Sequence, residues 1–350
     1  MPKRRSGGAI RTLKILVVNL LLIVALAEIG FRIYDWFQPS FVFYKDSYNR
    51  YRGAPGAPDW GFHLNTQGFK DLAFEPKRDG VYRILGLGDS FAFGVVPYAD
   101  NYLTRLEAML QARGAAVEIY NMGIPDIGPR DYLALLVHEG LALQPDMVLV
   151  SLFIGNDFSD SRRRGLHEYS YLASFLRYLS ALNQDYEGRV IHGPNDYCDD
   201  CPNFTTERYL QLEAKRSFVF RRGDPKFERR FDNAMHYLER LQSVCKREGI
   251  ELLVALIPDE LQINPDLREQ VARTHFPDLP ARAWDLQQPN RRLTEAFERL
   301  GIAYLDLLPT LSEPGQPPLY RPRDSHWNIA GNRRAAEALL PRVALYLERY

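Results

Sequence analysis

The chain has 350 residues, of which 46% are hydrophobic and 25% are charged, as in an ordinary globular protein with a sizeable core. Lysine and arginine together number 44, and so do aspartate and glutamate. The balanced charge excludes binding to nucleic acid through a generally basic surface, so any steering of a charged partner must be local.

A basic and then apolar segment begins the chain. Ile15 to Ala27 is apolar except for Asn19, and five basic residues precede it: Lys3, Arg4, Arg5, Arg11 and Lys14. The apolar run is shorter than the ~20 residues that a full membrane span usually needs. Aromatic residues continue it as far as Phe37, in the manner of an interfacial belt. We therefore expect residues 1–37 to be an uncleaved anchor in the inner (cytoplasmic) membrane, with the rest of the chain outside the cytoplasm.

Two other interpretations of this segment stay open. Ala25 and Ala27 form an Ala-x-Ala site, so cleavage after Ala27 would make residues 1–27 a signal peptide and the protein secreted. The segment could also be a buried core helix. With an anchor or a signal peptide, the body of the protein is exported, to the periplasm in a Gram-negative bacterium.

Residues 38–76 are rich in glycine, proline and aromatic residues, have no helical periodicity, and are expected to form a stalk and entry segment. Asn65 to Phe69 has the composition of a turn. The remaining residues, 77–350, are expected to form one catalytic domain.

Strands alternate with helices through this domain, which predicts βαβ units and a parallel sheet. The expected strands are Tyr82–Leu87, Val117–Tyr120, Met147–Ile154, Leu252–Ile257 and Ala303–Leu305. The expected helices are Leu103–Leu110, Pro129–Leu141, Phe231–Glu248, Pro289–Leu300 and Ala330–Leu347.

Residues 158–226 interrupt the alternation and are expected to be an insertion or cap. An insertion after a sheet strand would overhang the strand ends, so we expect substrate selection there. Its basic run, Arg162 to Arg164, is read as a solvated face in preference to an anion site. Cys198 and Cys201 can form a disulfide after export, while Cys245 is left over in a helical pattern. A redox motif or half of a zinc site is the weaker alternative.

Four short polar segments follow strands or precede a helix, where the carboxyl edge of a parallel sheet presents its ligand site. They are Gly88–Ser90, Asn121–Gly128, Gly155–Asp157 and Asp324–His326. A serine hydroxyl needs an imidazole to take its proton, and the imidazole needs a carboxylate to fix its tautomer. Ser90, His326 and Asp324 supply these three groups. The Ser90 N–H and the Asn156 amide can stabilise an oxyanion. The structural alternative is that Ser90 only caps a helix.

The order of these segments resembles that of the SGNH, or GDSL-type, esterase and acyltransferase superfamily. Gly88-Asp89-Ser90 is similar to its first block, the Asn121 loop to its second, Gly155-Asn156-Asp157 to its third, and the Asp324–His326 loop to its fifth. The resemblance implies an α/β, three-layer, flavodoxin-like fold with a five-stranded parallel sheet. It also implies Ser90 as nucleophile, His326 as base, Asp324 as its orienter and Asn156 in the oxyanion hole.

Two features depart from the family pattern. Where the second block usually has a glycine that donates an oxyanion N–H, this chain has Asp126, with Gly123 as the nearest alternative. The histidine block reads Asp-x-His-Trp-Asn, not Asp-x-x-His. Its spacing resembles that of alginate O-acetyltransferase-like relatives, in which the pair precedes the serine.

The other histidines lack a neighbouring nucleophile motif and are expected to be structural or exposed: His63, His138, His167, His192, His236 and His275. Asn328 is expected to cap the last helix, and Trp327 to line the acyl pocket or pack in the core. The chain has no GxxxxGK[ST] or HExxH motif, and we expect no metal or cofactor.

The sequence thus predicts an exported serine esterase that hydrolyses short acyl esters, above all acetyl esters, on envelope or extracellular polysaccharide. Its partners would be an acylated carbohydrate or other small ester and, through the N-terminal helix, a membrane. A polysaccharide O-acetyltransferase with the same triad is one alternative. A non-catalytic glycan-binding or scaffold protein on the same fold is the other, suggested by Asp126.

Overall fold

The computed structural model describes residues 6–37, 48, 52–160, 165–182 and 197–350. The chain divides into two compact units. One comprises residues 1–50 and 163–187, and the other comprises residues 51–162 and 188–350. The segment predicted as a single insertion, 158–226, is therefore shared between the two units, and its Arg162–Arg164 run lies outside the described residues.

The first unit contains the N-terminal helix α1 (Ser6–Phe37) and helix α7 (Tyr171–Leu182). The part of α1 from Arg11 to Phe37 has a mean hydropathy of 2.3 in its most apolar window, none of it buried, and is long enough to cross a membrane. The two helices pack through Phe31 and Phe175, whose ring centroids are 4.7 Å apart. Glu28 of α1 accepts hydrogen bonds from the first backbone N–H groups of α7.

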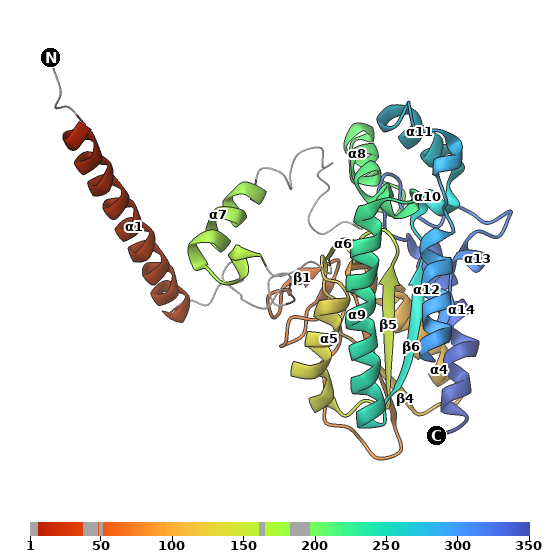
Figure 1. Ribbon diagram of the computed structural model, residues 1–350. Coiled ribbons are helices and arrows are strands. Elements are labelled where there is room, and N and C mark those ends of the chain that lie inside the picture. The colour runs from red at the N-terminus through yellow and green to blue at the C-terminus, as the bar shows by residue number, and fades with distance from the viewer. Residues whose placement is uncertain (1–5, 38–47, 49–51, 161–164, 183–196) are drawn as a thin grey trace. The chain divides into compact units, whose positions relative to one another are not determined.

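The second unit is built on a five-stranded parallel sheet, which confirms the predicted fold class (Figure 1). Its strands are β3 (Tyr82–Gly88), β4 (Val117–Asn121), β5 (Met147–Phe153), β6 (Glu251–Ile257) and β7 (Ala303–Asp306). They lie in the order β4-β3-β5-β6-β7, and all four neighbouring pairs are parallel. Every residue of β3 and β5 is buried, as expected for central strands covered on both faces.

Helices cover both faces of this sheet. Helices α4 (Tyr102–Ala112) and α14 (Ile329–Leu347) pack together on one face, and α5 (Pro129–His138) and α9 (Pro225–Glu248) pack together on the other (Figure 1). Shorter or more peripheral helices complete the unit: α3 (Ser90–Phe93), α6 (Asp157–Asp160), α8 (Thr206–Arg216), α10 (Glu260–Ile263), α11 (Pro265–His275), α12 (Gln288–Leu300) and α13 (Leu308–Leu311).

Some elements differ from those expected. Helix α5 ends at His138, short of the predicted Leu141, and a 3₁₀ turn from Gly140 to Leu143 follows it, because glycine disfavours continuation of an α-helix. Helices α10 and α11 were not predicted. The segment predicted as a stalk contains a small hairpin, β1 (Pro58–Asp59) and β2 (Phe62–His63), and its Phe69 is fully buried in the second unit.

Candidate active site

Ser90 is the first residue of α3 and is separated from the end of the buried strand β3 only by Asp89. Asp89 caps this short helix by accepting a hydrogen bond of 2.9 Å from the Phe91 N–H. As the first residue of the helix, Ser90 has a backbone N–H without an acceptor inside the helix. The tight strand-to-helix turn thus presents both the hydroxyl and an N–H donor at the carboxyl edge of the sheet.

Glycine at position 88 allows this turn to approach the neighbouring strand closely. A Cβ atom there would lie 2.8 Å from Ala92 Cβ, closer than real Cβ atoms pack, and 3.0 Å from Ser151 Cβ, a tight contact. Gly88 pairs with Ser151 of β5 in the sheet register. The Gly88–Ser90 turn therefore has no room for a side chain at position 88.

The loop before α14 brings the imidazole and the carboxylate to Ser90. His326 Nε2 lies 2.7 Å from Ser90 Oγ, and His326 Nδ1 lies 2.6 Å from Asp324 Oδ1. The His326 backbone N–H also donates to Asp324 Oδ1, at 3.2 Å. Asn328 caps α14 by accepting a hydrogen bond of 2.8 Å from the Gly331 N–H. The three sequence-predicted groups thus meet in one hydrogen-bonded chain, with the loop held at its helix end.

The carboxylate of Asp324 is almost fully buried, with a side-chain exposure of 2%. Its Oδ2 atom accepts hydrogen bonds from Asn203 and, at 3.3 Å, from the Arg321 guanidinium. Burial alone would raise the pKa of Asp324, but the charge and hydrogen bond of His326, together with Arg321, hold the pKa below its usual range. Asp324 is therefore an ionised partner for the imidazole.

Ser325 ties the same loop to helix α8. Its hydroxyl donates to the buried Glu213 at 3.2 Å and accepts a hydrogen bond from Arg216. Burial and the nearby Asp259 raise the pKa of Glu213 well above its usual value. Residues of the predicted insertion thus contact the histidine loop directly, from the side of α8.

The second-block loop places its two candidate oxyanion donors differently. The Gly123 N–H donates to Asn121 Oδ1 at 2.9 Å, so it is already used within the loop. Asp126 is exposed and has a left-handed backbone with φ of 59°, a conformation that aspartate tolerates better than most residues. Its charge acts on buried Asp89, beside Ser90. Asp126 thus stands at the position that the sequence analysis assigned to the second-block donor.

Asn156 lies in the loop that follows β5 and is half-buried. Its Oδ1 atom and Asp89 Oδ2 are both buried without a hydrogen-bond partner among the described residues. Burial raises the pKa of Asp89 to about 6, although the Phe91 N–H, the His326 charge and the Asn156 side chain act to lower it. The Asn156 side chain therefore lies against the buried carboxyl of Asp89, the residue before Ser90 in the chain.

Sequence reasoning missed three residues of this site: Asp89, Asn203 and Arg321. Asp89 was recognised only as part of the Gly-Asp-Ser motif, and its buried carboxyl is a property of the folded loop. Arg321 precedes Asp324 by three residues, a spacing that could have suggested an ion pair. Asn203 lies 121 residues before its partner, with no signal in the pattern. Trp327 is buried against Phe91 and so packs in the core.

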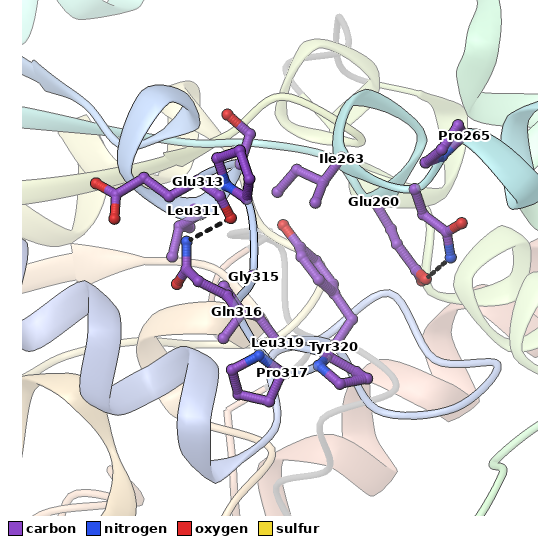
Figure 2. Close-up of a pocket in the computed structure, with 14 residues that line it drawn as sticks. Glu260, Ile263, Pro265, Leu311, Glu313, Gly315, Gln316, Pro317, Leu319 and Tyr320 are labelled. Atoms are coloured by element: carbon purple, nitrogen blue, oxygen red, sulfur yellow. Dashed lines mark hydrogen bonds between the residues drawn. The ribbon is translucent and has the colours of Figure 1, made fainter.

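A pocket of about 410 Å³ lies beside the segment that leads into the Asp324–His326 loop, on the side of α10 and α11. Its walls include Glu260, Tyr320 and a proline-rich turn, Pro314–Pro318 (Figure 2). None of the three triad residues lines it. Side-chain amides in the pocket wall donate hydrogen bonds to other wall residues; for example, Asn264 Nδ2 donates to Glu260 Oε1 at 2.9 Å. Among the described residues, no three side chains of His, Cys, Asp or Glu are grouped as a metal site would require.

The C-terminal part of the chain matches a protein-family model. A family model described as "SGNH hydrolase-like domain, acetyltransferase AlgX" matches residues 219–346. The matched part contains β6, β7, Asp324 and His326, and it does not extend to Ser90. No curated protein matches the chain in sequence.

Solved structures similar to this chain are esterases and acylhydrolases of low identity. An acetyl xylan esterase, AlAXEase, is 13% identical over 75% of this chain and 99% of its own, with a TM-score of 0.42. A lipase/acylhydrolase from Enterococcus faecalis is 12% identical over 76% and 96%, with a TM-score of 0.42. A mutant of Axe2, an acetylxylan esterase from Geobacillus stearothermophilus, is 15% identical over 75% and 94%, with a TM-score of 0.42.

Proposed function

We propose that the protein is an exported serine esterase that removes short acyl groups, above all acetyl, from envelope or extracellular polysaccharide. The match of residues 219–346 to an SGNH hydrolase-like family model supports this proposal. The observation that carries the proposal is the continuous chain of hydrogen bonds from Ser90 Oγ through His326 to Asp324. This is the arrangement that a serine needs to become a nucleophile at neutral pH.

In the first step, Ser90 Oγ attacks the acyl carbonyl carbon while His326 Nε2 takes the hydroxyl proton. The resulting imidazolium is stabilised by the ionised Asp324 at Nδ1. The tetrahedral intermediate collapses when His326 returns the proton to the departing sugar oxygen, which leaves an acyl-serine and a free sugar hydroxyl. The ester C–O bond breaks as the bond between Ser90 Oγ and the acyl carbon forms, the serine proton ends on the sugar oxygen, and no oxidant or reductant is needed.

The negative charge that develops on the carbonyl oxygen requires donors that are already in place. We assign this role to the Ser90 N–H and the Asn156 amide, with the Asp126 N–H as third donor. Loss of one such donor typically costs about 3–4 kcal/mol in the transition state. Because the Gly123 N–H is bonded to Asn121, we assign it no part in the oxyanion hole.

In the second step, His326 activates water, which attacks the acyl-serine and releases the carboxylic acid. A sugar hydroxyl in place of that water would give O-acetyl transfer by the same sequence of proton movements. The matched family's description as an acetyltransferase favours this second candidate function. The identity of the acceptor therefore separates the two activities.

Helix α1 supports an extracytoplasmic location, since its apolar face is unburied and long enough to span a membrane. Basic residues flank its N-terminal side, which favours their retention in the cytoplasm. We propose that α1 anchors the protein in the inner membrane, so that the second unit faces the periplasm.

The experiment that tests the proposal uses the full chain in detergent with a chromogenic acetyl ester and a fluorophosphonate probe. We expect ester turnover and covalent labelling of Ser90, both absent in Ser90→Ala. A wild-type chain that neither turns over the ester nor accepts the probe at Ser90 would instead support the non-catalytic binding role. An acetylated oligosaccharide and an unacetylated acceptor are then added together. Mass spectrometry distinguishes release of acetate by an esterase from a gain of acetyl on the acceptor by a transferase.

A further inference from the structure

The segment 197–203, here called the disulfide loop, lies against the carboxylate of the triad. Cys198 and Cys201 are disulfide-bonded, with Cα atoms 5.4 Å apart. No residue of the disulfide loop belongs to a helix or a strand. Its shape is therefore set by the cross-link and by its contacts with neighbours, since no regular backbone hydrogen bonding holds it.

The contacts of this loop converge on Asp324 and Arg321. The Asn203 amide donates to Asp324 Oδ2, on the opposite side of the carboxylate from His326. Arg321 Nη2 donates to the backbone oxygen of Cys198 at 3.1 Å and to Asn203 Oδ1 at 3.4 Å. The same guanidinium donates to Asp324 Oδ2 at 3.3 Å. Asn203 and Arg321 thus hold one carboxylate oxygen together, while the other oxygen faces the imidazole.

A second contact fixes the loop to the start of helix α14. Asp199 Oδ1 accepts a hydrogen bond of 3.0 Å from the Ile329 N–H, three residues after His326. Arg321 also lies over the ring of Tyr197, with its Cζ atom 5.2 Å from the ring centroid. The disulfide loop therefore touches the histidine loop on both sides of the Asp324–His326 pair.

From these contacts we propose that Asn203 is a positioning residue for the triad and that the Cys198–Cys201 disulfide holds it in place. This inference rests on the proposed esterase or transferase function. Asn203 does not touch the substrate or the reacting atoms. It acts through Asp324, whose rotation about its side chain would break the bond to His326 Nδ1. A carboxylate held on both sides keeps the imidazole in the tautomer that accepts the Ser90 proton.

The key variant is Asn203→Asp, which keeps the size and shape of the side chain but replaces the donor with a second carboxylate. We expect kcat to fall about 10- to 100-fold with little change in KM, as follows when one hydrogen bond to a charged group is lost. The kcat of Asn203→Ala is expected to fall by a similar factor. If position 203 only filled space, Asn203→Asp would behave like the wild type. A wild-type kcat in Asn203→Asp would overturn the proposal.

Asn264→Asp is the matched control. Asn264 also donates to a carboxylate, at 2.9 Å from Glu260 Oε1, but lies outside the triad. We expect its kcat to stay within about twofold of the wild type, as for a change that touches no catalytic group. Thermal melting of each variant distinguishes loss of positioning from loss of folding, because only the former leaves the melting temperature unchanged.

The disulfide is tested with the double variant Cys198→Ser, Cys201→Ser. We expect kcat to fall at least about threefold, because small displacements of catalytic groups lower rates strongly. Cys245→Ala, which removes the free buried cysteine, is the control and should retain the wild-type kcat. An unchanged kcat in the double variant would show that the cross-link has no part in holding Asn203.

If the wild-type chain lacks activity, the proposed function fails and hydrogen–deuterium exchange tests the positioning role independently. The amide of Arg321 donates to the His326 oxygen at 3.0 Å, and that of His326 donates to Asp324. Faster exchange at these amides in the double serine variant would support the role of the disulfide loop. Identical exchange in the two proteins would overturn it.

Discussion

His326 Nε2 and Ser90 Oγ lie 2.7 Å apart although 236 residues separate them in the chain. His326 lies in the loop before the last helix, and Ser90 begins the short helix after a strand near the middle of the sheet. The two meet because β3 ends at the same edge of the sheet that the loop before α14 covers. This relationship determines which substitutions should affect chemistry and which should affect stability alone.

His326→Ala is expected to lower kcat about 10⁴-fold, since the general base is lost. The fold should stay intact, because the substitution does not alter the core. The His326 side chain is 22% exposed, so its removal leaves no closed cavity. Hydrolysis of a chromogenic acetyl ester and a thermal melt provide the two measurements. Near-normal turnover by this variant would contradict the role of the imidazole.

Asp324→Asn should also inactivate the enzyme while preserving the shape of the loop. An amide at this position presents a donor or a weaker acceptor to His326 Nδ1 and disfavours the required tautomer, at a cost of about 10³- to 10⁴-fold in kcat. Labelling of Ser90 by a fluorophosphonate should slow in proportion. Equal labelling rates for the variant and the wild type would exclude Asp324 as the partner of the imidazole.

Asn156→Ala and Asp126→Asn test the oxyanion hole in opposite directions. Asn156→Ala removes a side-chain donor and should lower kcat about 10²- to 10³-fold.

Asp126→Asn keeps the backbone N–H and the left-handed conformation but removes a negative charge, so kcat should rise by about two- to fivefold. Steady-state kinetics on one ester decide both. A kcat for Asn156→Ala equal to that of the wild type would remove Asn156 from the site.

Gly123→Ala should destabilise the nucleophile loop. A Cβ atom there would lie 2.2 Å from the Phe93 backbone nitrogen and 2.5 Å from the Ala92 carbonyl carbon, and backbone cannot move aside as a side chain can. We expect a loss of about 1–3 kcal/mol in the free energy of unfolding, as in other overpacked sites. Chemical denaturation measures it. Gly114→Ala is a comparison with no atoms in the way, although its φ of 87° carries a backbone cost.

Glu107→Gln should change the pH dependence of stability. Burial, aided by the charge of Asp71, raises the pKa of Glu107 from 4.5 to about 7. Because the folded state binds the proton more tightly than the unfolded chain, the stability contributed by this group is fully present below pH ~4.5. It is lost as the pH rises through about 7.

The variant should therefore match the wild type at pH 4 and exceed it at pH 8 by about 1 kcal/mol, a value reduced for partial solvent exposure. Denaturant unfolding at the two pH values is the measurement. A wild-type chain that equals the variant at pH 8 would show that Glu107 is not a buried charge in the native state.

Local patterns in the sequence were sufficient to predict the strands, the long helices and the polar segments at their ends. Short continuous apolar runs predicted the strands, because a strand buried on both faces of a parallel sheet needs apolar side chains on both faces. The Gly88–Ser90 and Asp324–His326 segments could be paired as a hypothesis because their chemistry is complementary. These inferences depend only on residues close together in the chain.

Other features depend on which segments the fold brings together, and no local pattern contains that information. The order β4-β3-β5-β6-β7 and the register of its strands decide where the four loops meet. The bond of His326 with Ser90, and the contact of Asn203 with Asp324, appear only once the loops are placed. Apolar periodicity is a property of each segment alone, whereas a hydrogen bond between distant loops exists only when the whole core positions both of its partners.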